Sequence, residues 1–259
     1  KLIKDENNAF SKFKLFMGTE KKYHFKRSGR EMTPEELSAE VLKELKGIVL
    51  QKTNENVDSA VIAVPAAFEI PQTNATEKAA NLAGIKQIRL VQEPVAAALA
   101  YGFRKDMSKS IFLLVFDFGG GTFDAAIIRI GEGTMGVVDH EGNKDLGGGL
   151  IDERIVDEVL MPEVLKRYNL RDFHAGNERW MQARQTLFSL AEEAKILLSR
   201  KEVVEIWTDY LCLDDNGNPV EFEYEMTRKE VEKLAEPYIL RAINLSKKVL
   251  SENNLTPDD

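Results

Sequence analysis

The sequence is poor in the residues that build disulfide frameworks and zinc sites. Its 259 residues include a single cysteine, Cys212, and three histidines. One cysteine cannot form an internal disulfide, and the histidines lie too far apart to have the spacing of zinc ligands. We therefore expect a protein that folds without disulfides or zinc and works in a reducing compartment, the cytoplasm.

Long apolar runs and an excess of positive charge are also missing. The apolar run 111–116 is far too short to span a bilayer. The chain carries 35 Lys and Arg residues against 43 Asp and Glu residues, which gives a net charge of -8. Because an acidic chain has no general attraction for nucleic acid or anionic lipid, we expect neither nucleic acid nor a membrane as a partner.

The most informative segment is 111–130, with the sequence IFLLVFDFGGGTFDAAIIRI. Two apolar runs flank three glycines, a pattern that predicts a β-hairpin whose first strand is buried. Glycines at the tip let backbone N–H groups approach an anion, and Thr122 adds a hydroxyl donor. Asp117 and Asp124 flank the tip, and a carboxylate beside a phosphate needs a cation or water between them. The pattern favours a magnesium–phosphate site; a plain hairpin with solvated aspartates is the alternative.

Strand and helix patterns alternate along the rest of the chain, which predicts an α/β layered fold. Capping patterns at Thr33 and Thr227 mark two helix starts. Pro162 should kink or divide the helix that contains it near Met161, and the polar segment between Gly102 and Ser110 should join two lobes. We expect helices at 33–51, 76–83, 93–102, 150 onward, 178–199 and 227–251, a hairpin at 22–32, and strands at 58–64, 87–91, 134–140, 202–207 and 219–224.

Five segments together resemble the ATPase domain of the DnaK-type, seventy-kilodalton heat-shock chaperones. They are VPAAF at 64–68, RLVQEPVAAALAYG at 89–102, FDFGGGTFD at 116–124, LGGGLIDERIV at 146–156 and AEEAKILLS at 191–199. The glycine hairpin alone would fit any actin-like or sugar-kinase relative, but the other segments are more specific. The resemblance covers essentially the whole chain. It implies an incomplete actin-like ATPase fold of the α/β class, with ribonuclease-H-like sheets in two lobes that flank a nucleotide cleft.

The resemblance also implies domain boundaries. The first lobe is expected at 1–106, with a peripheral subdomain at 1–33 and a core part at 34–106. The second lobe is expected at 107–259, with its core at 107–149 and 228–259 and its peripheral subdomain at 150–227.

The family motifs imply roles for individual residues of this sequence. Lys14 matches a catalytic lysine that contacts the γ-phosphate or the attacking water. The implied catalytic residues are Lys14, Glu93, Asp117 and Thr122, and the implied metal shell is Asp117, Glu93 and Asp124, mostly through water. The implied nucleotide contacts are Gly119, Gly120, Gly121, Thr122, Gly147 and Gly148 on the phosphate side and Glu192, Lys195 and Ser199 on the adenosine side. The last three share one helix face because of their i, i+3, i+7 spacing.

The implied ligands are ATP or ADP with Mg2+, and K+ is a further candidate cation. The implied activity is ATP hydrolysis, which closes the lobes and so controls peptide binding in a separate domain that this sequence lacks. The implied partners are unfolded client peptides, a J-domain co-chaperone and a nucleotide-exchange factor. Two other functions on the same fold stay open: a small-molecule, sugar-type kinase and a non-catalytic actin-like structural protein.

The sequence departs from the family pattern at several positions. Leu15, Thr73 and Ile196 stand where the family usually has arginines. These replacements predict altered coupling to the J-domain partner and weaker stacking on adenine. The family's first phosphate loop and last adenosine loop have no counterpart here, so we expect a divergent fragment, truncated at both ends, that holds part of the phosphate clamp.

Because part of the phosphate clamp is missing, the isolated 259-residue chain should bind Mg-ATP weakly and hydrolyse it slowly or not at all. Isothermal titration calorimetry of the chain with Mg-ATP checks this expectation. Tight binding by the isolated chain would contradict it.

Overall fold

The computed structural model describes residues 9–10, 12–101 and 110–259. Over these ranges helices and strands alternate as predicted, and the fold is mixed α/β. No helix in the described ranges is long and apolar enough to cross a membrane. The predicted crossover between the lobes, with Gly102 at its start, falls on 102–109 and lies outside the described residues.

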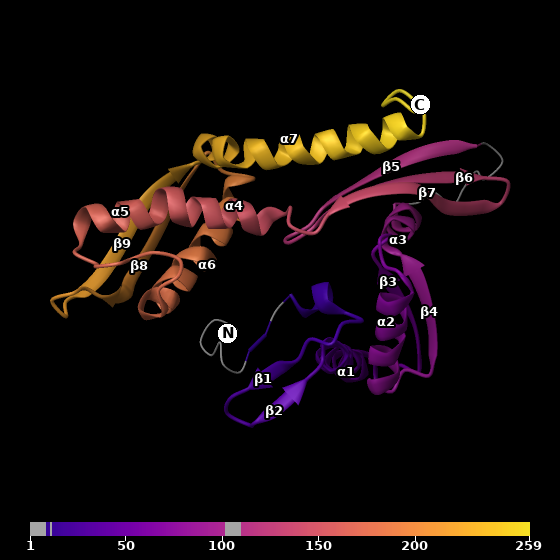
Figure 1. Cartoon of the computed structure of the whole chain (residues 1–259), viewed down its shortest axis with the longest axis horizontal. Helices are drawn as coiled ribbons and strands as arrows, with labels where there is room; N and C mark the ends of the chain where they lie inside the picture. The colour runs from indigo at the N-terminus through magenta and orange to yellow at the C-terminus, as the bar shows by residue number, and fades with distance from the viewer. Residues whose placement is uncertain (1–8, 11, 102–109) are drawn as a thin grey trace.

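The first group of elements precedes that crossover (Figure 1). In order they are a 3-10 turn at Phe13–Phe16, β1 (Tyr23–Phe25), β2 (Arg30–Met32), α1 (Pro34–Thr53), β3 (Ser59–Val64), α2 (Ile70–Leu82), β4 (Gln87–Gln92) and α3 (Glu93–Ala100). The strands β1 and β2 form the predicted hairpin, and β3 pairs in parallel with β4. Helix α1 begins where predicted because Thr33 Oγ1 accepts from the Glu36 N–H at 3.3 Å and the Glu36 carboxylate accepts from the Thr33 N–H at 2.8 Å.

The second group follows the crossover. It contains β5 (Ile111–Phe118), β6 (Phe123–Gly131), β7 (Thr134–Asn143), α4 (Gly148–Ile155), α5 (Met161–Arg167), a 3-10 turn at Glu178–Trp180, α6 (Met181–Leu198), β8 (Val203–Leu213), β9 (Pro219–Thr227) and α7 (Arg228–Glu252). An antiparallel sheet has the order β5-β6-β7, and β8 and β9 form a separate antiparallel hairpin. From β9 the long helix α7 runs back over the first of these sheets (Figure 1).

Helix α2 begins earlier than the sequence pattern predicts, at Ile70 instead of Thr76. Gln72 Oε1 accepts from the Glu69 N–H at 3.2 Å, and Pro71 occupies the first turn, where its missing N–H costs nothing. The start was missed because a glutamate at the cap position is an unusual helix signal.

Pro162 does divide its helix, as predicted. The segment Val156–Leu160 between α4 and α5 is a π-turn, and the Met161 N–H bonds to Val156 O, five residues back. A proline has no N–H for the usual bond four residues back, so the preceding turn widens.

Strand β6 is the buried centre of its sheet. Phe123, Ala125 and Ile127 are fully buried against α7, while Ile128 and Ile130 pack on the other face against Ala98 of α3. Helices therefore cover both faces of the strand that begins directly after the glycine tip, and this packing fixes the tip in space.

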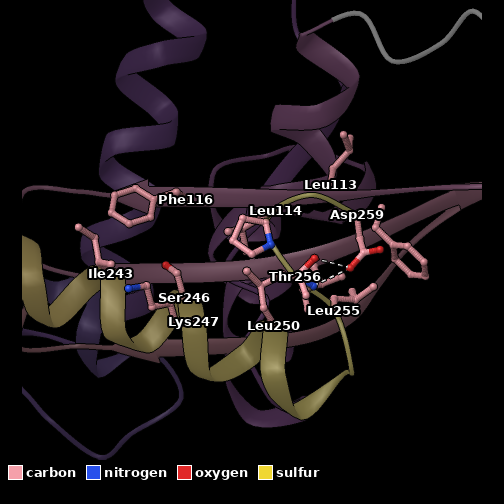
Figure 2. A pocket seen from close by; sticks show the side chains of 13 residues that line it. Leu113, Leu114, Phe116, Ile243, Ser246, Lys247, Leu250, Leu255, Thr256 and Asp259 are labelled. Atoms are coloured by element: carbon pink, nitrogen blue, oxygen red, sulfur yellow. Dashed lines mark hydrogen bonds between the residues drawn. The ribbon is translucent and has the colours of Figure 1, made fainter.

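Strand β5 differs from the expectation of a buried strand. It pairs with β6 alone within the described residues, so Phe112, Leu114 and Phe116 are 37–44% exposed. A groove of about 320 Å³ lies between β5 and α7, and Leu114, Phe116, Ile243 and Leu250 are among the residues that line it (Figure 2). The α7 helix therefore covers this face of β5 only in part.

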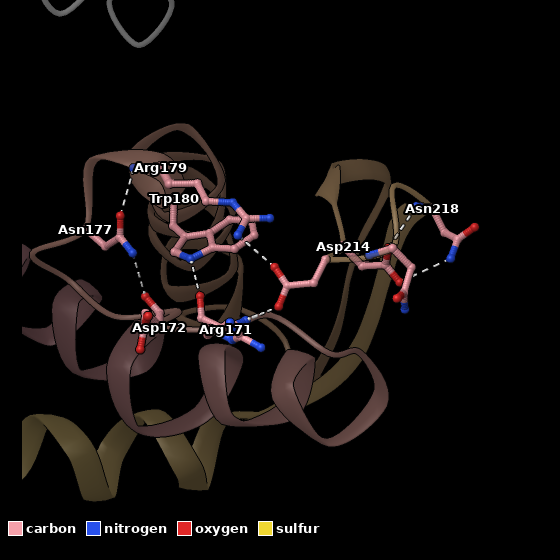
Figure 3. Close-up of polar contacts among 9 residues, drawn as sticks. Arg171, Asp172, Asn177, Arg179, Trp180, Asp214 and Asn218 are labelled. Carbon is pink, nitrogen blue, oxygen red and sulfur yellow. Dashed lines mark hydrogen bonds and ion pairs between the residues drawn. The ribbon is translucent and has the colours of Figure 1, made fainter.

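A polar network ties the loop before α6 to the tip of the β8–β9 hairpin (Figure 3). Asp215 accepts from the Arg171 N–H at 2.6 Å and pairs with the Arg179 guanidinium at 2.7 Å. These contacts, the backbone bond first, hold the pKa of Asp215 below its ordinary value. The buried Trp180 donates from Nε1 to Arg171 O at 3.0 Å. The network therefore links the loop before α6 to the β8–β9 hairpin. We call the part of the protein that contains α4, α5, α6, β8 and β9 the outer region.

The substitution Leu187→Ala should destabilise this outer region by about 2–5 kcal/mol, because a fully buried α6 side chain leaves a cavity. The matched variant Leu197→Ala, on the same helix but 37% exposed, should change stability by about 0.5 kcal/mol. Both tryptophans, Trp180 and Trp207, lie in this region, so tryptophan fluorescence during urea unfolding reports on it alone. Equal destabilisation by the two variants would contradict the described packing.

Candidate functional site

The predicted glycine hairpin is present, and its tip is an open backbone bend. The Gly119 N–H donates to Thr122 O at 2.9 Å, which closes the turn between β5 and β6. Added Cβ atoms on Gly120 or Gly121 would meet nothing within 4 Å, so one side of the bend is free. The two strands place Asp117 directly opposite Asp124.

A second glycine turn packs on the back of this bend. The Gly148 N–H donates to Gly119 O at 2.9 Å, and the Gly149 N–H donates to Gly120 O at 2.7 Å. A Cβ on Gly147 would lie 2.8 Å from Gly119 O and from backbone carbons of Gly120 and Gly121. The turns can only meet backbone to backbone if Gly147 has no side chain.

Lys14 and Glu93 meet although 79 residues separate them. Lys14 lies on the Phe13–Phe16 turn, Glu93 is the first residue of α3, and Lys14 Nζ is 2.6 Å from Glu93 Oε1. Their side chains are 56% and 28% exposed, so the pair adds at most about 1 kcal/mol to stability. Its importance is geometric, because it brings the predicted catalytic lysine to a predicted metal-shell carboxylate.

Two cavities connect this pair with the glycine hairpin. Lys14, Thr122, Asp124 and His140 are among the residues that line a cavity of about 670 Å³. Glu93, Asp117 and Asp124 line a second cavity of about 290 Å³. Asp124 belongs to both, so the predicted catalytic and metal-shell residues gather around one place in the fold.

The carboxylates of this place repel one another. Burial is the largest cause that raises the pKa of Asp124, and the charges of Glu93 and Asp117 raise it further. Such a cluster attracts cations, and its oxygen ligands are those that Mg2+ prefers. No group of three His, Cys, Asp or Glu side chains in the described ranges is placed to hold a metal ion directly. Contact of these carboxylates with a metal through water stays a prediction.

Two of the three predicted adenosine contacts lie on α6 and the third, Ser199, directly follows it; their surroundings differ. Lys195 points inward, and its Nζ donates to Gly148 O at 3.0 Å and to Asp152 Oδ2 at 2.7 Å. Glu192 and Ser199 lie at exposed positions, and Ser199 Oγ donates to Ile196 O at 2.6 Å within the helix. Lys195 therefore reaches the phosphate-side turn, and its partner Asp152 was not predicted. The available signals were its place at the end of the motif LGG-x-x-xD at 146–152 and its charge among the apolar positions Leu150, Ile151, Ile155 and Val156.

Comparison with known proteins decides the family. A model of the family described as Hsp70 protein matches residues 3–259. The chain belongs to the Hsp70 family. It is 35% identical over 257 residues to the Chaperone protein DnaK of Metamycoplasma hominis, which covers 99% of this chain and 42% of that protein. It is also 35% identical over 258 residues to the Chaperone protein DnaK of Thermotoga petrophila and of Thermotoga maritima, covering 100% of this chain and 42% of each.

Membership of the Hsp70 family confirms the predicted actin-like ATPase fold class. The described part of this Hsp70 chain has several small sheets in place of large ones, and it spans less than half the length of the curated relatives it matches. The assignment of lobes and subdomains to 1–106 and 107–259 stays a prediction.

The three departures from the family pattern have distinct surroundings in this Hsp70 chain. Leu15 is 46% exposed and lines the larger cavity beside Lys14. Thr73 donates from Oγ1 to Glu69 O at 2.6 Å, inside its own helix. Ile196 is 60% exposed on α6, an apolar side chain on the predicted adenosine face.

The substitution Asp124→Asn should stabilise the ligand-free protein at about pH 7. The pKa of Asp124 is raised above its ordinary value of 3.8, so the folded state holds a proton that the unfolded chain releases, and stability falls as pH rises through that window. Removing the charge should raise the urea midpoint, and the gain should shrink as pH falls through the raised pKa of Asp124 and be absent below about 3.8. Urea unfolding followed by circular dichroism measures this.

Asp139→Asn is the control of opposite sign. Asn253 Nδ2 donates to Asp139 Oδ2 at 2.7 Å and holds the pKa of Asp139 below its ordinary value. Its contribution is present at neutral pH and is lost as pH falls, so Asp139→Asn should destabilise at about pH 7. A destabilising Asp124→Asn at that pH would contradict the described electrostatics.

Proposed function

We propose that this chain is the nucleotide-binding part of a DnaK-type chaperone ATPase and binds Mg-ATP at the Gly119–Thr122 bend. The observation that carries the proposal is the meeting of Lys14 and Glu93 beside a bend whose outer side is open. A plain hairpin with solvated aspartates would not need a lysine and a glutamate from distant parts of the chain next to it. The names of the relatives favour a chaperone over a sugar-type kinase or a structural protein.

The chemistry follows from what phosphoryl transfer to water requires, which is charge neutralisation and a positioned water. Backbone N–H groups of Gly120 and Gly121 and the Thr122 hydroxyl would bind terminal phosphate oxygens. Lys14 would neutralise charge on the γ-phosphate or orient the attacking water. Glu93, Asp117 and Asp124 fit a hydrated cation, because they are carboxylates whose mutual repulsion a cation relieves. Bound there, Mg2+ would supply charge stabilisation for the phosphates, and K+ is a second candidate for the cation shell.

In the full-length gene product, ATP binding and hydrolysis would close two lobes, 1–106 and 107–259, and so control peptide affinity in a separate domain. A J-domain co-chaperone, a nucleotide-exchange factor and unfolded client peptides would be the partners. Gly147, Gly148, Glu192, Lys195 and Ser199 complete the proposed nucleotide contacts. A cytoplasmic location is part of the proposal and rests on the single cysteine of the sequence.

The test uses the full-length gene product with Gly120→Ala and Lys14→Ala. A Cβ on Gly120 meets nothing within 4 Å in the protein but would occupy the open side of the bend. We expect this variant to keep its stability and to lose at least about tenfold in Mg-ATP affinity. Lys14→Ala should keep ATP binding and lose about a hundredfold in turnover. Gly136→Ala, also with open space for its Cβ but in β7, is the matched control. Unchanged affinity and unchanged turnover in both test variants would overturn the proposal.

A further inference from the structure

We propose that Asp152 is a positioning residue: it holds Lys195 so that the ammonium ties helix α6 to the phosphate-side glycine turn, and thereby couples the adenosine end of the site to the phosphate bend. This inference rests on the proposed function, since it concerns how that site is held together. Neither the family match nor the names of the relatives assign a role to Asp152.

The contacts of Lys195 define the tie. Its Nζ lies 2.6 Å from Asp152 Oδ1 and hydrogen-bonds to Oδ2 at 2.7 Å. The same Nζ donates to Gly148 O at 3.0 Å. The Asp152 side chain is 2% exposed and that of Lys195 is 22% exposed. One ammonium group of α6 therefore contacts both the Asp152 carboxylate of α4 and the carbonyl of Gly148, the residue at which the glycine turn passes into α4.

A single residue, Gly148, carries the tie onward to the bend. Gly148 accepts from Lys195 with its carbonyl and donates to Gly119 O with its N–H, at 2.9 Å. The Gly149 N–H adds a parallel bond to Gly120 O. The two glycine turns are in close contact at Gly147, where an added Cβ would lie 2.8 Å from the backbone of the bend. A shift of Lys195 should therefore move the bend with it.

The Asp152–Lys195 ion pair carries a desolvation cost that an interaction serving stability alone would not need. Burial is the largest cause of the raised pKa of Asp152; Lys195 lowers this pKa, and the nearby Glu192 and Glu153 raise it. Well-packed apolar residues of similar size are often as stabilising as a buried ion pair, or more so. What they cannot supply is a donor for Gly148 O. The hydrogen bond to the turn is thus the contribution that an apolar replacement would not restore.

The test separates positioning from stability in the full-length gene product. Three variants are compared with the unchanged protein: Asp152→Asn, the apolar double Asp152→Leu with Lys195→Met, and the conservative Lys195→Arg. Asp157→Asn is the matched control, because it breaks an ion pair with Arg184 at 3.0 Å in the same region without touching the glycine turns. Urea unfolding by tryptophan fluorescence gives stability, and calorimetry gives affinities for adenosine and for Mg-ATP. Steady-state kinetics gives kcat and KM.

We expect Asp152→Asn to lower the ratio of Mg-ATP affinity to adenosine affinity by about tenfold, with adenosine affinity itself changed by less than about twofold. The apolar double variant should regain stability but not the affinity ratio, and in variants with a lowered ratio kcat should fall as well. Lys195→Arg should recover part of the ratio. Asp157→Asn should leave the ratio unchanged.

Three results would overturn the inference. In the first, the apolar double regains both stability and the affinity ratio, which makes the pair structural. In the second, the protein without substitutions binds and hydrolyses ATP, but Asp152→Asn either lowers adenosine and Mg-ATP affinity equally or alters neither. The inference about Asp152 then fails while the proposed function stands. In the third, the unchanged full-length protein does not bind Mg-ATP, and the proposed function fails together with the inference.

Discussion

Two hydrogen bonds between glycine backbones are the constraint on which the rest of the site depends. Through them the 147–149 turn holds the Gly119–Thr122 bend from behind, while the front of the bend stays open. Backbone contact at this distance requires that Gly147 has no side chain, because its Cβ would lie 2.8 Å from the backbone of the bend. A bend held by packed backbone can present its own N–H groups to a ligand without reorganising, and preorganised donors are the most effective kind for stabilising charge.

The elements around the bend position it from several sides. Helices α3 and α7 cover the two faces of β6, the strand that begins after the bend. The first residue of α3 is Glu93, so the helix that packs on the sheet also brings a carboxylate to the site. Burial, and after it the charges of Glu93 and Asp117, raise the pKa of Asp124 there. The repulsion among these carboxylates is unfavourable in the ligand-free protein, and a bound cation would relieve it. Groups with perturbed pKa values are typical of functional sites.

Sequence reasoning succeeded where the determinants are local. The glycine hairpin, the capping boxes at Thr33 and Thr227 and the break at Pro162 each follow from residues within one turn or two strands. The start of α2 was missed because Glu69 and Gln72 form an uncommon cap. The exposure of β5 was missed because an apolar run does not reveal how many neighbours its strand has.

Long-range contacts mark the limit of the sequence argument. No local pattern brings Lys14 to Glu93; roles for both at one site were expected only because the sequence resembles a known family, and their ion pair was not predicted. The partnership of Lys195 with Asp152, 43 residues apart, was not expected at all. Helix periodicity places Lys195 on a face of α6, but only the three-dimensional packing shows that this face reaches the glycine turn.

The most direct test of the central claim observes the backbone amides of the bend. In the full-length protein labelled with 15N-glycine, addition of Mg-ATP should shift the amide resonances of Gly119, Gly120 and Gly121, while those of Gly133 and Gly217, in turns of other hairpins, stay in place. The shifts should require Mg2+ and should weaken in Lys14→Ala. Saturating Mg-ATP that leaves the bend resonances unmoved, or moves those of Gly133 and Gly217 equally, would contradict the claim that this bend binds phosphate.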